Sequence, residues 1–338
     1  MKILVAGLFI ASSALAQSRE PIIDMHLHAR NADYMGPNPP PMCAPFREMP
    51  RWDLPKPIEE GLTVNTIPPC ANPIFAAKTD EEVMRSTIEV MKRRNIIGMV
   101  SGEPELMSRW KAAGGERIIA GLDLRLGVDS GHSHVARRTA ESVRALHDQG
   151  AFAVLGEVMA QYEGIPPNDE RLEPYWALAE ELSIPVGIHM GAGGPGDPYF
   201  GNPGYRARNS NPLLLEDVLV RHPKLRIYIM HAGYPMLEPL RALLFAHPQV
   251  YVDIASIVYT EPRSVFYNYL RGIVEAGYGD RVMFGSDQMI WPGVIEPSIR
   301  AIEEAPFLSK AQKRDILYNN AARFLRLGPD VIASHHRM

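Results

Sequence analysis

The sequence contains eight short apolar runs, and each is followed by a segment with helical patterning. Each run is nearly continuous in Ile, Val, Leu, Ala and Gly, which is typical of strands that are covered on both faces. Eight alternating units of strand and helix predict an α/β fold, the (β/α)8 or TIM barrel. The runs are PIIDMHLHA from residue 21, IIGMVSG from 96, RIIAGLDLR from 117, FAVLGEVMAQY from 152, IPVGIHMG from 184, LRIYIMHAG from 225, VYVDIAS from 250 and VMFGSDQM from 282.

The segments between the runs predict amphipathic helices, for example over residues 79–95, 169–182 and 261–277. Thr79 followed by Glu82 is the pattern of a capping box at the start of a helix. The ending KAQKRDILYNNAARFLRLG predicts a C-terminal helix packed outside the barrel.

Residues 1–16 differ from the rest of the chain, because one lysine is followed by an apolar run and then by Ala-Leu-Ala. This order is typical of a signal peptide with an A-x-A cleavage site. The run is too short to cross a membrane, which takes about 20 apolar residues. We therefore expect cleavage before Gln17 and export of one barrel domain, residues 17–338, to the periplasm or the medium without a stable membrane anchor. Mass spectrometry of exported protein that still contains Lys2 would contradict this expectation.

The composition is that of a soluble globular protein, with 46% hydrophobic and 22% charged residues. The net charge of −4 leaves no basic excess that would favour nucleic acid as a partner. A small-molecule substrate is therefore the expected partner, and assembly into a homodimer remains open.

Residues 30–79 form an unusually long connection between the first strand and the first helix, and they hold eleven of the 30 prolines. Long connections of this kind are usually functional lids or disordered linkers. This one leaves the C-terminal end of a strand, where barrel active sites are built. We predict a lid, with disorder as the alternative. In an oxidising compartment Cys43 and Cys70, both in this segment, predict a disulfide that holds it, and two unrelated buried thiols are the alternative.

His26 and His28 stand one residue apart at the end of the first run. Side chains at positions i and i+2 of a strand point to the same face, and Asp24 shares that face at a deeper position. Two imidazoles side by side can chelate a metal ion, with Asp24 placed to orient a ligand histidine or an adjoining side chain. Two solvent-facing histidines are the alternative.

In four further runs Glu157, His189, His231 and Asp287 lie in the C-terminal half. That half of each strand faces the catalytic rim of a barrel, so side chains from five strands are expected to converge there. Histidine and carboxylate suit zinc, and also manganese or iron, so we predict one or two divalent ions. The predicted metal ligands are His26, His28, Glu157, His189, His231 and Asp287.

The other seven histidines are expected outside this site. Two precede the sixth and seventh strands, two open a helix in which positions i and i+2 do not share a face, one lies within a helix and two belong to a polar tail. In that order they are His222, His247, His132, His134, His147, His335 and His336.

The set DMHLH, GIHMG, MHAG and FGSD resembles the amidohydrolase superfamily, and more narrowly its amidohydrolase-related branch, which includes the aminocarboxymuconate-semialdehyde decarboxylases. The resemblance covers roughly residues 21–328, including the ending DILYNNAARFLRL. It implies a metal held by His26, His28, His189 and Asp287, with His231 as a nearby acid or base. The motif LGEV departs from the decarboxylase pattern, since an acidic residue on the fourth strand is similar to the two-metal members such as the metal-dependent DNase branch. The metal count therefore stays open at one or two.

These features predict a metal-dependent hydrolase that uses activated water on a C–N or C–O bond of a small amide, lactone or ester. Asp287 would take the proton of that water and deliver it to the leaving group, while His231 polarises the carbonyl or holds a second ion. The alternatives are a metal-dependent nonoxidative decarboxylase of a small aromatic or enoic acid, and an exported metal-binding or interaction protein without catalysis.

Substrate contacts are expected from the lid and from the loop after the fifth run. Arginines there could clamp a carboxylate, although each of them alone is also explained as a solvated surface charge. The candidate substrate residues are Arg47, Arg51, Trp52, Tyr205 and Arg206.

Overall fold

The computed structural model of the chain describes residues 20–63, 70–126, 136–199 and 201–338. The predicted signal peptide and the His132–His134 pair lie outside the described residues. Within the described ranges no helix combines the length and the apolar character that a bilayer crossing needs.

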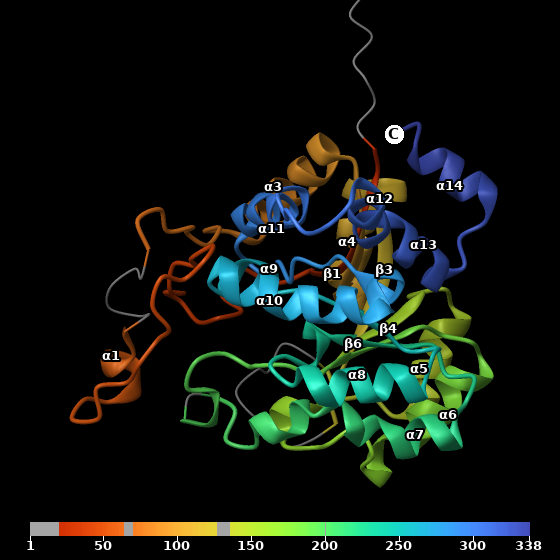
Figure 1. The fold of residues 1–338 in the computed structure, drawn as a ribbon, viewed down its shortest axis with the longest axis horizontal. Coiled ribbons are helices and arrows are strands. Elements are labelled where there is room, and N and C mark those ends of the chain that lie inside the picture. The colour runs from red at the N-terminus through yellow and green to blue at the C-terminus, as the bar shows by residue number, and fades with distance from the viewer. Residues whose placement is uncertain (1–19, 64–69, 127–135, 200) are drawn as a thin grey trace, which may run out of the picture.

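Eight parallel strands pair in chain order, so the predicted barrel is confirmed. The barrel is closed by the residues that follow the last strand, which pair with the first strand. The Met25 amide donates to the Phe284 carbonyl, and the His28 amide donates to the Gln288 carbonyl, each at 2.9 Å. Helices surround the strands (Figure 1). The strands are β1 (Ile22–His28), β2 (Ile96–Gly102), β3 (Ile118–Leu124), β4 (Val154–Val158), β5 (Val186–His189), β6 (Ile227–Met230), β7 (Tyr251–Asp253) and β8 (Val282–Met283).

The α-helices lie between and after the strands, as the patterning predicts. They are α1 (Ile58–Gly61), α3 (Asp80–Arg94), α4 (Pro104–Gly114), α5 (Ala140–Asp148), α6 (Glu173–Glu181), α7 (Glu216–Arg221), α8 (Leu237–Ala246), α9 (Ile257–Thr260), α10 (Arg263–Ile273), α11 (Ile295–Glu303), α12 (Lys310–Arg314), α13 (Asn320–Leu325) and α14 (Pro329–His335).

The capping box predicted at the start of α3 forms only in part. The Thr79 hydroxyl accepts a hydrogen bond from the Glu82 amide at 3.1 Å. The Glu82 carboxylate accepts from the Lys78 amide at 2.8 Å instead of closing the box on Thr79. The carboxylate satisfies a backbone donor one residue earlier, so the helix start is still stabilised.

The C-terminal segment differs from a single outer helix. It forms α12, a π-helical turn (Asp315–Asn319) and α13. Its Tyr318 and Phe324 pack against Ile23 and Met25 from the first half of β1. The segment therefore closes the N-terminal end of the barrel.

The prediction of a polar tail for His335 is wrong. Pro329 stands at the first position of α14, where a proline is well tolerated, and the helix runs on to His335. The His335 side chain is buried, and its Nδ1 lies 3.0 Å from the Tyr318 hydroxyl. Ile332 packs on the same apolar cluster, which explains why this end of the chain is folded.

The lid, residues 30–79, has a small core of its own. Cys43 and Cys70 form the predicted disulfide. Cys43 packs with Phe46, Ile58 and Leu62 in a cluster separate from the barrel core. The lid is the orange segment at the left of Figure 1, with α1 at its outer end.

The lid reaches the loops that follow three of the strands. After β8, the Trp291 indole donates to the Pro40 carbonyl at 3.1 Å. After β7, the Thr260 carbonyl accepts from the Phe46 amide at 3.0 Å. After β5, Tyr199 lies against the Trp52 ring, with the ring centroids 5.5 Å apart. These contacts hold the lid at the C-terminal rim.

Replacing Cys43 and Cys70 together by serine is expected to destabilise the lid by about 3–4 kcal/mol, because the disulfide closes a loop with a sequence separation of 27 residues. Hydrogen exchange of the lid amides measures the effect, and the amides of the barrel strands serve as the internal control. Equal protection of the lid amides in both proteins would contradict the prediction.

Candidate metal centre

Six buried residues, at or just after the ends of five strands, meet at the C-terminal rim, and none is more than 9% exposed as a whole residue. They are the six predicted ligands: His26, His28, Glu157, His189, His231 and Asp287. Three triplets among them place candidate ligand atoms within 4.8 Å of one another. The cluster is therefore suited to a metal ion.

Two carboxylates lie among the imidazoles. The Asp287 Oδ1 atom is 3.2 Å from His28 Nε2 and 3.6 Å from His26 Nε2. The Glu157 carboxylate is 3.5 Å from His28 Nε2 and 3.9 Å from the Nε2 atoms of both His26 and His189. The ring of His231 completes the group, with its centroid 4.6 Å from that of His189.

One carboxylate, Asp253 at the end of β7, fixes two of the histidines. Its Oδ2 lies 3.1 Å from His26 Nδ1. Its Oδ1 accepts from the backbone amides of His231 at 2.9 Å and Ala255 at 3.0 Å. The His231 Nδ1 in turn donates to the Ala255 carbonyl at 2.9 Å. Both rings therefore turn Nε2 towards the cluster, as metal-ligating histidines held by outer partners do.

His189 is oriented by the side-chain amide of Gln161. The Gln161 Nε2 donates to the Gly191 carbonyl at 3.0 Å and to the Ser210 hydroxyl at 2.8 Å. Its Oε1 is therefore the atom that accepts from His189 Nδ1 at 2.9 Å. The proton of His189 sits on Nδ1, and the lone pair of Nε2 faces the cluster.

His28 has two candidate partners at Nδ1, the Ser101 hydroxyl and the Arg30 guanidinium, each at 2.9 Å. A hydroxyl can accept the Nδ1 proton, whereas a guanidinium can only donate. A metal on Nε2 therefore requires the arrangement with Ser101. Arg30 is buried and also pairs with Asp123, which gives its charge a second partner.

The donor set fits a divalent metal by two further observations. His26 Nε2 is fully buried and has no hydrogen-bond partner, which is costly for a polar atom. Burial raises the pKa of Glu157 to about 8, and the neighbouring Asp287 and Asp123 carboxylates add to this against the pull of His26. A cation among these groups would satisfy the nitrogen and offset the crowding of negative charge.

The Asp24 carboxylate accepts hydrogen bonds from backbone amides rather than from a histidine ring. Its Oδ1 accepts from the His26 amide at 3.0 Å and from the Ser286 amide at 3.1 Å. The strand pairing of β1 is irregular between Asp24 and Leu27, so these bonds support a bulged backbone. Asp24 therefore orients His26 through the main chain, and the ring is held by Asp253.

The candidate arginines lie at the surface. The side chains of Arg47, Arg51 and Arg206 are exposed. Arg206 donates to the carbonyls of Pro203 at 2.9 Å and Tyr205 at 2.7 Å. Their contact with a substrate stays a prediction.

The two candidate aromatic residues support loops. Trp52 is half-buried beside Tyr199. Tyr205 is buried, and its hydroxyl accepts from the Gly193 amide at 2.8 Å and donates to the Gly191 carbonyl at 3.1 Å. Tyr205 thus fixes the loop after β5 beside the cluster.

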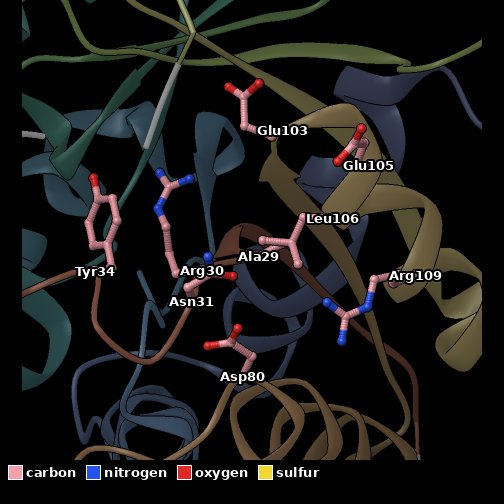
Figure 2. Close-up of a pocket in the computed structure, with 9 residues that line it drawn as sticks. All are labelled: Ala29, Arg30, Asn31, Tyr34, Asp80, Glu103, Glu105, Leu106 and Arg109. Carbon is pink, nitrogen blue, oxygen red and sulfur yellow. The ribbon is translucent and has the colours of Figure 1, made fainter. Parts of the chain in front are cut away.

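A cavity of about 300 Å³ opens next to the cluster, on the side of β1 and β2. Figure 2 shows Arg30 and Tyr34 side by side in its wall, and the Arg30 guanidinium lies 4.6 Å from the centre of the Tyr34 ring. Since Arg30 also contacts His28, the cavity adjoins the predicted metal ligands. It is lined by Ala29, Arg30, Asn31, Tyr34, Asp80, Glu103, Glu105, Leu106 and Arg109.

Similar solved structures show the same fold. An uncharacterised TIM-barrel protein from Bordetella bronchiseptica is 18% identical, with a TM-score of 0.56 over 75% of this chain and 86% of that one. The 5-carboxyvanillate decarboxylase of Sphingomonas paucimobilis is 14% identical, with a TM-score of 0.54 over 91% and 100%. A probable 2-pyrone-4,6-dicarboxylic acid hydrolase from Acinetobacter baumannii, with citric acid bound, is 16% identical, with a TM-score of 0.52 over 90% and 99%.

No curated protein matches the sequence. The family model described as amidohydrolase matches residues 23–327, which include all six clustered side chains. The chain therefore belongs to the amidohydrolase family.

Proposed function

We propose that the protein is a metal-dependent hydrolase that cleaves an amide, lactone or ester bond of a small molecule with activated water. The observation that carries the proposal is the place of Glu157, a second carboxylate 3.5 Å from His28 and 3.9 Å from His26 and His189. It gives the cluster enough ligands for two ions. Nonoxidative decarboxylation with one ion is the rival, and the similar structures include both a decarboxylase and a probable hydrolase.

The six clustered side chains would hold the metal, which we take to be zinc, with manganese or iron as alternatives. A divalent metal in such a site lowers the pKa of a bound water towards about 7 and so supplies a nucleophile at neutral pH.

Asp287 is placed to handle the proton. Burial alone would raise its pKa, but the neighbouring His26, His28 and His231 hold the pKa below its usual range. The ionised carboxylate can take the proton of the attacking water and return it to the leaving group. His231 presents Nε2 to the cluster, where it can hold an ion or accept a proton.

Activity tests separate the rivals. Wild-type protein reloaded with zinc, manganese or iron is expected to hydrolyse members of a panel of esters, lactones and amides. Release of carbon dioxide from aromatic or enoic acids, without any hydrolysis, would establish the decarboxylase instead. Bound metal without turnover on either panel would favour a metal-binding protein.

Replacing Glu157 by glutamine is expected to reduce the metal stoichiometry from two ions to one, because the neutral amide is a much weaker ligand than a carboxylate. Inductively coupled plasma mass spectrometry on dialysed protein measures this. Glu163→Gln is the matched control, since the Glu163 side chain is as buried as that of Glu157, at 5% exposed, but pairs with Arg125 and is not one of the six clustered side chains. A wild type with a single ion that Glu157→Gln keeps would remove the support for two-metal hydrolysis.

A further inference from the structure

A tyrosine that follows β4 touches a predicted metal ligand. The Tyr162 hydroxyl lies 2.9 Å from His189 Nε2. The side-chain Oε1 of Gln161 accepts from His189 Nδ1, so the other nitrogen, Nε2, carries the lone pair. The phenol is therefore the donor in this bond.

The position of the Tyr162 ring is fixed by its surroundings. The residue lies in a short 3-10 turn (Ala160–Glu163) directly after β4. Its ring centroid is 4.4 Å from that of His189 and 5.9 Å from that of Tyr205. Tyr205 is itself pinned to the loop after β5 by its two backbone hydrogen bonds. The Tyr162 hydroxyl therefore stays beside the cluster when its partner changes.

The bond from Tyr162 to His189 and a metal on His189 exclude each other, because Nε2 has one lone pair. A metal held by His189 would take that lone pair, and the phenol would then donate to another acceptor beside the cluster. We propose that this acceptor is the carbonyl oxygen of the substrate, and that Tyr162 is a further catalytic residue of the hydrolase. The inference rests on the proposed function and adds the group that stabilises the oxyanion.

In the proposed reaction Tyr162 donates a hydrogen bond but transfers no proton. The water oxygen bonds to the carbonyl carbon, and the electron pair of the C=O bond moves to the carbonyl oxygen, where the Tyr162 hydroxyl donates a hydrogen bond. The electron pair then returns, the bond to the leaving group breaks, and the leaving group takes the proton held by Asp287. A donor aimed at such an oxyanion contributes about 10²–10³ in kcat.

His231 is less suited to this task. Its Nδ1 proton is donated to the Ala255 carbonyl, so the neutral ring has no proton on the nitrogen that faces the cluster. It offers a lone pair to the site, whereas Tyr162 offers a donor. The two residues are therefore complementary, one towards the metal and one towards the substrate oxygen.

The experiment compares Tyr162→Phe with the wild type and with Tyr267→Phe. Tyr267 also donates one phenol hydrogen bond, to the Ala301 carbonyl at 2.9 Å, but it lies on α10 and reaches α11, outside the cluster. Three quantities are measured: metal content, the affinity of the metal-loaded protein for inorganic phosphate by calorimetry, and kcat and KM on the ester or lactone that the wild type hydrolyses.

Tyr162→Phe is expected to keep its metal, to bind phosphate about tenfold more weakly or worse, and to lose about 10²-fold in kcat with little change in KM. Tyr267→Phe should match the wild type in all three. Unchanged phosphate affinity and kcat in Tyr162→Phe would overturn the inference, and so would loss of metal, which would make the phenol a support of the ligands.

The outcomes separate this inference from the proposed function. If the wild type hydrolyses nothing on the panel, the hydrolase proposal fails, while the phosphate comparison still decides whether Tyr162 donates to an oxyanion at the cluster. A wild type that binds metal but no phosphate counts against the inference. Normal hydrolysis by Tyr162→Phe leaves the hydrolase standing and removes only the role of Tyr162.

Discussion

Replacing His26 by alanine is expected to remove most of the bound metal and, with it, the activity. His26 Nε2 lies between both carboxylates, 3.6 Å from Asp287 and 3.9 Å from Glu157, and its ring is held by Asp253. Loss of an outer partner of a ligand alone costs about 10- to 100-fold in metal affinity. Loss of the ligand itself should therefore exceed 100-fold.

Metal content after dialysis and affinity in a chelator competition measure this effect. His147→Ala is the matched control, because His147 lies on α5 beside Asp148 and Phe152, outside the cluster. His28→Ala should behave like His26→Ala, and Asp24→Asn should lose less metal. Full metal content and full activity in His26→Ala would refute the metal centre as a whole.

Replacing Asp287 by asparagine is expected to lower kcat by about 10²- to 10⁴-fold at saturating metal, since the amide cannot carry the proton between water and leaving group. The four histidines and Glu157 remain, so a large part of the metal should stay bound. The measurement is kcat at increasing metal concentration, which separates weaker metal binding from slower chemistry.

Asp330→Asn, an exposed position on α14, serves as the control for the charge change. Recovery of the wild-type kcat by Asp287→Asn at high metal would show that Asp287 acts only as a ligand. The proton would then have to be carried by another group of the cluster.

The barrel could be predicted from the sequence because its strands are buried on both faces, so each appears as an apolar run, although the last four runs are clearly longer than the strands within them. The clustered side chains were found by one criterion, a histidine or carboxylate in the C-terminal half of a run. The geometry of parallel strands then brings such residues to one rim, as it does for Glu157 and Asp287 from strands far apart in the chain.

The same criterion also fits Asp123 on β3 and Asp253 on β7, which sequence reasoning passed over. Both are fully buried at the rim, where they hold Arg30 and His26. Tyr162 gave no such signal, because it follows its strand in a 3-10 turn and its direction depends on packing against Tyr205.

The loops were the hardest part to predict, because their contacts are tertiary. Trp52 and Tyr205 support the loop after β5, while Arg206 donates to the backbone carbonyls of Pro203 and Tyr205. The helix at His335 depends on an apolar surface supplied by Tyr318, which the local sequence does not reveal.

The separate core of the lid has a consequence for how this enzyme can diversify. Phe46, Ile58 and Leu62 pack around Cys43 in a cluster of their own, and among the described residues the lid meets the barrel through loop contacts such as that of Trp52 with Tyr199. None of these side chains is among the six that would hold a metal, so substitutions in this cluster are expected to leave those six in place. Exchange of the whole lid between related barrels is therefore expected to keep the metal centre intact while the surface above it changes.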